Sequence, residues 1–412
     1  MTGNPKDPLH GLVRLGNHYV PGIWNYLLPY ELDELKVPSE RRASCMNCPK
    51  AAFEGFRDDY RCCTYHPRVP NYMLGLAAQG KKAKGIIEKM NRDGFLLPDG
   101  FVTTPGQWAD FLADVAEDRF GKSESVLCPF LERKNGHCNI YAYRNGVCST
   151  FFCQHDHGDR GENFWEHLQE TVSQVELALS QWCLSEIGFD VTAYFKRMDD
   201  LAAEIHEVTD PATNGWSDEH LDYLWGDKRG RELETYAQCA ALVSKNRHDL
   251  WEIACRSDIL EASQFDQASI EVVPKEYQDE IDEEDFEPGE TTPPYKLWQQ
   301  TMTDHRKLWR LPSAPLVLNK RISFHDNEED SEESQYYKDQ TVEMQFGKRK
   351  SGKKYKWRHF MSAEESEGLK YFDRPRVLSR HTLAELKELI GGEPRDFICE
   401  WYARDVLVES EL

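Results

Sequence analysis

Eight of the chain's twelve cysteines lie between residues 45 and 153. They are Cys45, Cys48, Cys62, Cys63, Cys128, Cys138, Cys148 and Cys153. The spacing of the first two, CxxC, brings two sulfurs onto one small turn, where both can reach the same metal. Four such thiolates complete a tetrahedral zinc site or hold an iron–sulfur cluster, so these sulfurs are enough for two sites. We expect the rest of the chain to be built around this cysteine-rich segment.

The cellular compartment decides what clustered cysteines do. Residues 1–30 lack the basic stretch and apolar run of a secretory signal, and no segment reaches the roughly 18 apolar residues of a membrane span. We therefore expect a cytoplasmic protein that does not enter a membrane. Because thiols stay reduced in the cytoplasm, the cysteines are expected to be metal ligands or catalytic groups rather than disulfides.

Charge argues against a general nucleic-acid binder. The net charge is -22 and the pI is near 5.1, whereas attraction to phosphates needs a basic surface. One basic stretch, 348–359, follows an acidic run at 326–333. We expect the two runs to pair with each other, with nucleic-acid contact by the basic stretch as the alternative. The charged segments are also candidates for binding a protein partner.

Helical periodicity predicts a mainly α chain. Apolar residues repeat at helical spacing in the segments 71–92, 107–120, 163–183, 191–205 and 218–255. Gly75, Gly80 and Gly85 weaken the first of these helices. Asn163 and Glu166 form a capping box, which predicts that the third helix starts there. Three further cysteines lie among apolar positions and are expected to be buried, inert thiols: Cys183, Cys239 and Cys255.

The end of the chain predicts a compact module. A second capping box, Thr382 with Glu385, opens a helix that Gly391 stops. Pro394 suits the first turn of the next helix, and a strand is expected at 406–408. Helix, turn, helix and strand in this order resemble a winged-helix module. In an acidic chain we expect such a module to pack or to dock a protein partner rather than to read DNA.

A chain of 412 residues is long enough for two or three domains. The predicted fold is mainly α, with an irregular cysteine-rich metal-binding region, an α-helical middle and a small winged-helix-like C-terminal module. The expected divisions are 1–162 for the cysteine-rich domain, 163–274 for a helical region packing on it, 275–294 for an acidic linker, 295–372 for a charged, partly flexible segment and 373–412 for the C-terminal module.

The adjacent pair Cys62 and Cys63 suggests how the sulfurs divide. Neighbouring residues in an extended segment project to opposite sides, so each is expected to serve a different four-sulfur site. The first site would begin with Cys45, Cys48 and one of this pair. The second would take Cys138, Cys148 and Cys153. Cys128 fits either site.

Three histidines near the cysteines are weaker candidate ligands: His66, His155 and His157. The His155-Asp156-His157 pattern is able to bind a catalytic metal or to move protons beside a cluster. The alternative is an exposed polar loop without metal.

The cysteine motifs occur in a distinctive order. Cys45-Met-Asn-Cys48 and Cys62-Cys63 precede Cys128-Pro129-Phe130-Leu131, and the last motif is Cys138-Asn-Ile140-Tyr141-Ala-Tyr-Arg144-Asn-Gly-Val-Cys148-Ser-Thr-Phe151-Phe-Cys153. This order resembles the CxxCxxCC family of zinc- or iron-chelating proteins, also called YkgJ-like. The resemblance covers about residues 45–185. The chain departs from the family pattern at Asn145, where the family has Pro, and at Ser149, where Arg is usual.

The resemblance implies binding of metal or of iron–sulfur clusters by the eight cysteines, as one or two centres of the [4Fe–4S] type. One branch of the family, similar to flagellin lysine methylases, is associated with a cluster and with S-adenosylmethionine-dependent methylation of protein lysines. The sequence has no GxGxxG after a strand and no CxxxCxxC, so whether the chain is an enzyme stays open. The alternative function is that of a non-catalytic zinc protein, whose metal holds the cysteine-rich region while other parts bind a partner.

Overall fold

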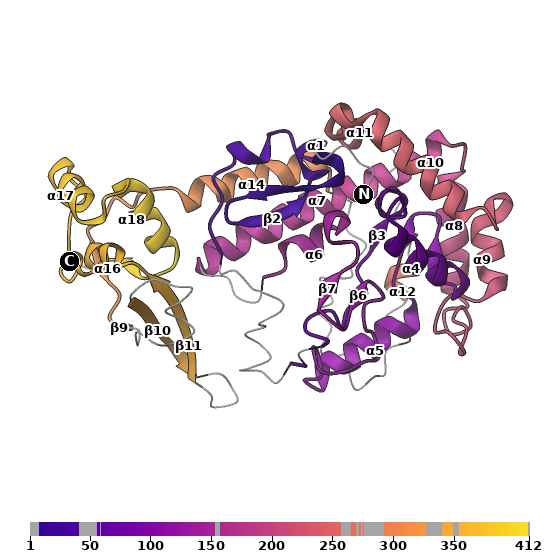
Figure 1. Ribbon diagram of the computed structural model, residues 1–412, viewed down its shortest axis with the longest axis horizontal. Coiled ribbons are helices and arrows are strands. Elements are labelled where there is room, and N and C mark those ends of the chain that lie inside the picture. Colours follow the sequence, from indigo (N-terminus) through magenta and orange to yellow (C-terminus); the bar gives the residue numbers. More distant parts are fainter. Residues whose placement is uncertain are drawn as a thin grey trace. The chain divides into compact units, whose positions relative to one another are not determined.

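The computed structural model is mainly α with a few short strands, which confirms the class predicted from helical periodicity (Figure 1). It describes residues 8–40, 56–57, 59–152, 157–256, 265–268, 272, 275, 292–326, 340–348 and 354–410. The chain divides into two compact units. The first comprises Met1–Lys36, Arg42–Cys153 and Leu168–Trp298, and the second comprises Val37–Arg41, Gln154–His167 and Gln299–Leu412.

Helices form most of the first unit. They are α1 (Trp24–Leu27), α3 (Asn71–Ala77), α4 (Lys81–Arg92), α5 (Pro105–Ala116), α6 (Gly146–Thr150), α8 (Val191–Ala202), α9 (Asp218–Trp225), α10 (Glu232–Lys245), α11 (Leu250–Arg256) and α12 (Phe265–Ala268). Two further helices run across the division between the units: α7 (Gly158–Glu186) and α14 (Pro294–Leu308).

Small antiparallel sheets accompany these helices. A hairpin joins β1 (Leu12–Leu15) to β2 (His18–Pro21). A three-stranded sheet has the order β3 (Val69–Pro70), β5 (Gly100–Phe101), β4 (Leu96–Leu97). A second hairpin joins β6 (Leu131–Glu132) to β7 (His137–Cys138). Within the described residues, the cysteine-rich segment contains α3 to α6 as well as the short strands β3 to β7.

α3 is buried along its whole length and packs against α10. Gly75 makes this packing possible, because a Cβ there would lie 2.0 Å from the carbonyl oxygen of Tyr236. The Tyr236 hydroxyl donates to the carbonyl oxygen of Leu97 at 2.6 Å, which ties α10 to β4. The single helix predicted over 71–92 is wrong: α3 has ended before Gly80, which is extended and precedes the first residue of α4.

Other helix boundaries were predicted with mixed success. α5 and α8 confirm the helices expected at 107–120 and 191–205 to within a few residues. The capping box predicted at Asn163 is wrong, because α7 starts at Gly158 and Asn163 lies inside it. The segment 218–255 contains α9, α10 and α11 rather than one continuous helix, with 3-10 turns between them.

A buried carboxylate anchors the β4–β5 turn. The Asp99 side chain is 2% exposed and accepts from Arg68 Nη2 at 2.5 Å and from the Tyr194 hydroxyl at 2.9 Å. Its backbone carbonyl accepts from the Ser180 hydroxyl at 2.8 Å. These bonds satisfy a charge that would otherwise be costly to bury, and they fasten the small sheet to α7 and α8.

The second unit combines helices with two small sheets. Its helices are α16 (Ala363–Lys370), α17 (Arg380–Ile390) and α18 (Pro394–Ala403). The antiparallel strands are ordered β11 (Lys354–Met361), β10 (Gln340–Lys348), β9 (Ile322–Asp326) in one sheet, and β12 (Leu407–Glu409) pairs with β8 (Leu316–Leu318) in the other. The core between them includes Phe372, Leu386, Ile398, Trp401 and Leu407.

The order of helix, turn, helix and strand predicted for the chain's end is present at 380–409. Gly391 ends α17 with a φ of 63°, and Pro394 starts α18, as predicted. The predicted cap is wrong by one turn, because the Ser379 side chain accepts from the amide of Thr382, which therefore lies in the first turn of α17.

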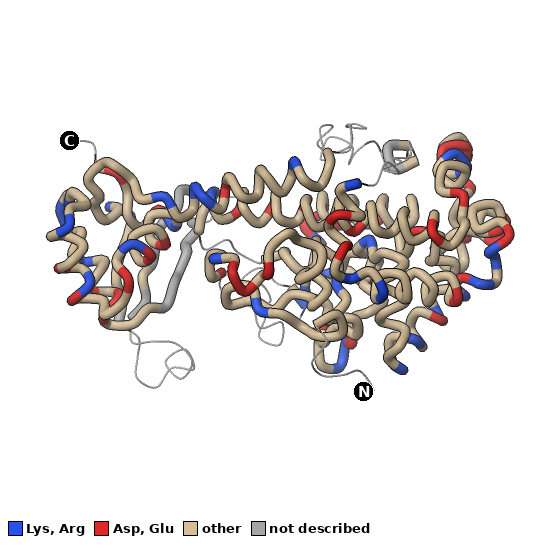
Figure 2. Tube along the Cα trace, turned by 90° about the horizontal axis from the view of Figure 1, so that it is seen from above, with Lys and Arg blue, Asp and Glu red and all other residues tan. Residues whose placement is uncertain are grey.

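Acidic and basic residues are interspersed along the described parts of both units (Figure 2). Many of them pair, as Arg229 does with Asp218 and Asp222 at 2.7 and 2.8 Å. Most of the predicted acidic linker and of the two opposite charge runs lies outside the described residues, at 276–291, 327–339 and 349–353. None of the helices in the described ranges has both the length and the apolar character that crossing a membrane requires.

Candidate sulfur site

Five of the eight clustered cysteines lie within the described residues, on short segments far apart in sequence: Cys62 and Cys63 after an irregular turn, Cys128 before β6, Cys138 on β7 and Cys148 on α6. Backbone hydrogen bonds join these segments. The amide of Cys128 donates to the carbonyl oxygen of Cys63 at 2.8 Å. Leu131 pairs with Cys138 across the β6–β7 hairpin.

Four of these thiols lie close enough to affect one another's ionisation. Burial raises the pKa of Cys128 above its ordinary value, and the neighbouring thiols of Cys148 and Cys138 raise it further. Burial also raises the pKa of Cys148, to about 12, and Cys138 and Cys62 add to that rise. Because charges interact appreciably only at short range, these effects indicate that four thiols lie near one another: those of Cys62, Cys128, Cys138 and Cys148. Without a cation among them, Cys128 and Cys148 keep their protons at neutral pH.

Other groups near these sulfurs favour the thiolate. The backbone of Phe130 and Leu131 near the Cys128 sulfur lowers its pKa, although burial outweighs this effect. The Arg144 guanidinium lowers the pKa of Cys148 against the larger effect of burial. Arg144 is itself held in place, since its Nη1 donates to the carbonyl oxygen of Cys148 at 3.0 Å. It also stacks on the Tyr141 ring, 3.8 Å from the centroid.

α6, which carries Cys148, is fixed at its first turn by two side chains. The Asn145 Oδ1 accepts from the amide of Cys148 at 3.1 Å. Glu176, on α7, accepts from the amide of Gly146 at 3.1 Å. Burial raises the pKa of Glu176 to about 8, so this carboxyl holds a proton at neutral pH. At higher pH, where Glu176 is ionised, its charge contributes to the raised pKa of Cys148.

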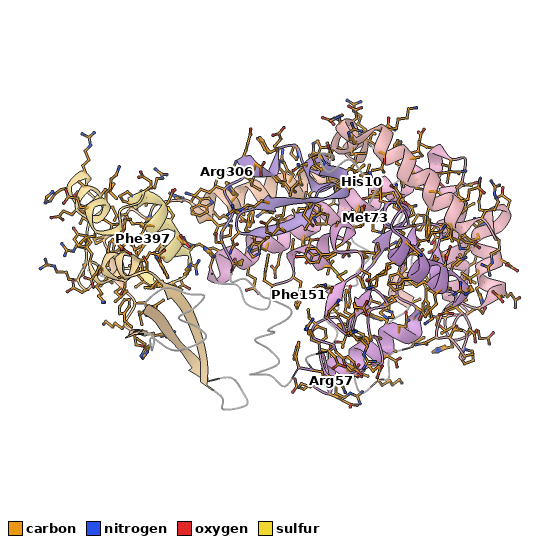
Figure 3. The ribbon with its side chains drawn as sticks, viewed as in Figure 1. His10, Arg57, Met73, Phe151, Arg306 and Phe397 are labelled. Carbon is orange, nitrogen blue, oxygen red and sulfur yellow. The ribbon has the colours of Figure 1, made fainter. Side chains whose placement is uncertain are left out.

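A charged cluster around Tyr60 fixes the segment that precedes Cys62. The Arg57 and Arg133 guanidinium groups lie over the Tyr60 ring, 4.1 and 4.9 Å from its centroid. The Tyr60 hydroxyl donates to Glu124 at 2.6 Å. Hydrogen bonding, chiefly from Arg57, lowers the pKa of Asp59 to about 2. Arg57 lies at the edge of the first unit, below α5 in Figure 3, and the cluster ties its segment to the one that follows Cys128.

The remaining predicted ligands are distributed unevenly. Cys45, Cys48, Cys153 and His155 lie outside the described residues. Within the described ranges, no three or more His, Cys, Asp or Glu side chains are arranged to hold a metal ion. Nine cysteines in those ranges are free thiols. Cys148 and the three thiols near it therefore lie close together without having ligand geometry.

The cysteines predicted to be inert lie in the helical part of the first unit. Cys183 and Cys239 are buried, which confirms the prediction for both, and the Cys183 thiol donates to the carbonyl oxygen of Cys239 at 3.7 Å. Cys255 is only partly buried. Burial raises the pKa of Cys255 to about 11, so its thiol stays protonated at neutral pH.

The two described candidate histidines have different surroundings. His66 is buried, its Nε2 lies 3.1 Å from the carbonyl oxygen of Leu127, and its ring contacts Phe95 and Phe101. Burial lowers the pKa of His66 and favours the neutral imidazole. His157 belongs to the second unit, where its Nδ1 lies 3.4 Å from Glu40 Oε1.

Sequence reasoning missed Glu176 and the cluster around Tyr60. Glu176 acts on a segment 30 residues earlier in the chain, and no motif links the two positions. The only indication in the sequence is that Glu176 directly follows the apolar Val175 within the helix predicted at 163–183. The chain matches no protein-family model, no curated protein and no solved structure.

Proposed function

We propose that the chain binds an iron–sulfur cluster of the [4Fe–4S] type through cysteine thiolates. The observation that supports this most is the convergence of four thiols from distant segments: Cys138 and Cys148 raise the pKa of Cys128, and Cys138 and Cys62 raise that of Cys148. A bound cation or cluster removes that penalty, because the thiolates then face positive charge rather than one another. Cys45, Cys48, Cys63 and Cys153 are the remaining candidate ligands, for the same centre or for a second one.

The chain's own groups suit this chemistry. Four thiolates around a cluster leave net negative charge, which the backbone of Phe130 and Leu131 and the Arg144 guanidinium partly offset. The protonated carboxyl of Glu176 adds no further negative charge near Cys148. When bound, a cluster supplies one-electron transfer or supports a modification reaction. Lysine methylation is the most specific such reaction that the family resemblance implies.

A structural zinc site is the second candidate. It is favoured by the shortness of the elements that carry two of the cysteines: β7, with Cys138, has two residues, and α6, with Cys148, has five. Regions of this kind are commonly held by a tetrahedral, all-sulfur zinc site with no open position.

We further propose that the helices and strand at 380–409 form a winged-helix-like module that docks a protein partner. Acidic and basic residues are interspersed along the described chain (Figure 2), which suits a protein partner better than nucleic acid. Reduced thiols at the sulfur site would require a reducing compartment such as the cytoplasm.

The test is to purify the full chain without oxygen, record its visible spectrum and measure iron, acid-labile sulfide and zinc. Broad absorption near about 400 nm that bleaches with dithionite, together with matching iron and sulfide, supports the cluster. A colourless chain with stoichiometric zinc supports the second candidate instead. Cys148→Ser should lose the metal, whereas Cys239→Ser, which alters a buried thiol in the helical part, should keep it. A chain that holds neither metal nor cluster refutes both candidates.

A further inference from the structure

Arg61, directly before Cys62, buries a guanidinium in which two of the three nitrogens lack a hydrogen-bonding partner among the described residues. The residue is 6% exposed, and its Nε and Nη1 have no acceptor among the described residues. Its backbone is left-handed, with a φ of 56°, and its amide donates to the carbonyl oxygen of Arg57 at 2.9 Å. An arginine cannot escape this burial by losing its proton, so the arrangement is costly unless negative charge is nearby.

The guanidinium lies against the turn between β6 and β7. A Cβ on Gly136 would be 1.3 Å from Arg61 Nη1 and 2.2 Å from its Cζ, so any side chain at this position would displace it. Gly136 also has a φ of 64°, a conformation that glycine adopts without strain. Cys138 follows on β7, two residues later. The buried cation therefore borders both the segment that carries Cys62 and the segment that carries Cys138.

Neighbouring arginines have partners of a different kind. Arg57 and Arg133 are exposed, and each donates to Asp59, at 3.0 Å in both ion pairs. Arg144 donates to backbone carbonyl oxygens, including that of Tyr19 at 3.2 Å. Within the described ranges, no carboxylate accepts a hydrogen bond from the Nε or Nη1 of Arg61. The negative charge expected beside Arg61 is that of the cysteine thiolates, which form when a metal or cluster displaces the thiol protons.

We propose that Arg61 is the built-in counter-charge of the sulfur centre, held over Gly136 so that its positive charge offsets the net negative charge of the loaded thiolates. This inference rests on the proposed function, since without a metal centre the charge would have nothing to offset. Arg61 acts on the centre through charge and is a positioning residue. The guanidinium is therefore destabilising in the metal-free chain and stabilising in the loaded chain.

The test compares Arg61→Met, Arg61→Lys and the control Lys134→Met, which removes one exposed positive charge from the turn between β6 and β7. Zinc(II) added to the metal-free full chain is the probe, and its affinity is measured by competition with a chromophoric chelator. Arg61→Met should weaken zinc binding about 10- to 100-fold, as changes to groups around a metal's ligands commonly do. Arg61→Lys, which keeps the charge, should recover most of that loss. Lys134→Met should stay within about threefold of the unsubstituted chain, because exposed charges are screened.

Thermal unfolding provides a readout that a merely structural arginine would not give. Arg61→Met should leave the Tm of the metal-free chain unchanged or raise it, and should lower the Tm of the zinc-loaded chain. Zinc affinity of Arg61→Met within threefold of the unsubstituted chain, or a lower Tm already without metal, overturns the assignment of Arg61. If Arg61→Met does not fold, Arg61→Lys carries the test, and a loss of affinity in it as large as about 100-fold would overturn the assignment. An unsubstituted chain that binds no zinc and holds no iron refutes the proposed function itself.

Discussion

Glu176→Gln should remove a pH-dependent loss of stability that the buried carboxyl imposes on the first unit. Glu176 is 4% exposed, accepts one hydrogen bond from the amide of Gly146, and has a second oxygen with no partner among the described residues. Burial raises its pKa from 4.5 to about 8. The unfolded chain therefore releases this proton at a lower pH than the folded chain does.

The sign and size follow from proton linkage. Between the two pKa values the folded state binds more protons than the unfolded state, so the free energy of unfolding falls as pH rises. Each pH unit in that interval is worth about 1.4 kcal/mol. From about pH 5 to about pH 7.5 the folded chain should therefore lose about 3 kcal/mol relative to Glu176→Gln, which cannot ionise. Below about pH 4.5 the effect of the carboxyl vanishes, because both states are protonated.

Urea unfolding followed by tryptophan fluorescence across this pH range measures the difference between the two chains. Glu170→Gln is the matched control, since Glu170 is exposed on the same helix, and it should run parallel to the unsubstituted chain at every pH. A constant difference between the unsubstituted chain and Glu176→Gln from about pH 5 to about pH 7.5 would refute the reasoning, because it would mean that Glu176 ionises alike in the folded and unfolded states.

Substitutions at four further positions test the packing that positions the site. Gly75→Ala should lower the free energy of unfolding by about 1–3 kcal/mol, because its Cβ would meet a carbonyl of α10. Gly85→Ala on α4, where no atom lies within 4 Å, should instead raise it by about 0.5–1 kcal/mol, and urea titration that finds the same sign for both would contradict this. Asp99→Asn should lower the free energy of unfolding by about 1–2 kcal/mol in the same assay. The loss is smaller than for a fully buried ion pair, because the side chain of the paired Arg68 is 43% exposed. An unchanged urea midpoint would contradict the role of Asp99 in anchoring the β4–β5 turn. Asn145→Ala should lower the free energy of unfolding by about 1 kcal/mol and speed hydrogen exchange at the amide of Cys148. Asn145→Ser keeps a side-chain acceptor for this amide and should not speed its exchange. Equal exchange rates in the two variants would exclude Asn145 as the cap of α6.

The sequence was most informative where the physics is local. Apolar periodicity predicted α5 and α8 and the burial of Cys183 and Cys239, because each depends on which face of a helix is apolar. Gly391 and Pro394 were predicted for the same reason, since a left-handed helix end and a first-turn proline are properties of single residues.

Sequence reasoning failed where a distant segment decides the outcome. Gly75 was taken to weaken a helix, whereas close contact with α10 requires it. The box at Asn163 has the letters of a helix start, but the preceding residues continue the helix, and the cap pattern alone does not reveal that. Arg61 lies against Gly136, and Glu176 accepts a hydrogen bond from the amide of Gly146. Both partners are distant in sequence, so only the folded chain shows these contacts.

The clustering of cysteines was readable from spacing alone, but their division between sites was not. Effects on ionisation associate Cys62 with Cys148, and Cys138 and Cys148 with Cys128, whereas the backbone hydrogen bond of Cys128 is to the adjacent Cys63. This grouping depends on the β6–β7 hairpin and on α6. The expectation that the Cys62 and Cys63 side chains project to opposite sides stays a prediction, because it assumes that the segment carrying them is extended.

X-ray absorption at the iron and zinc edges of the anaerobically purified full chain would address the sulfur centre directly. Thiolate ligation predicts a first shell of about four sulfur atoms at about 2.3 Å around the bound metal, with a further iron neighbour if a cluster is present. That shell should disappear in a variant with Cys62, Cys128, Cys138 and Cys148 all replaced by serine. A first shell of nitrogen and oxygen at about 2.0–2.2 Å, or an unchanged sulfur shell in the serine variant, would contradict the role assigned to these four thiols.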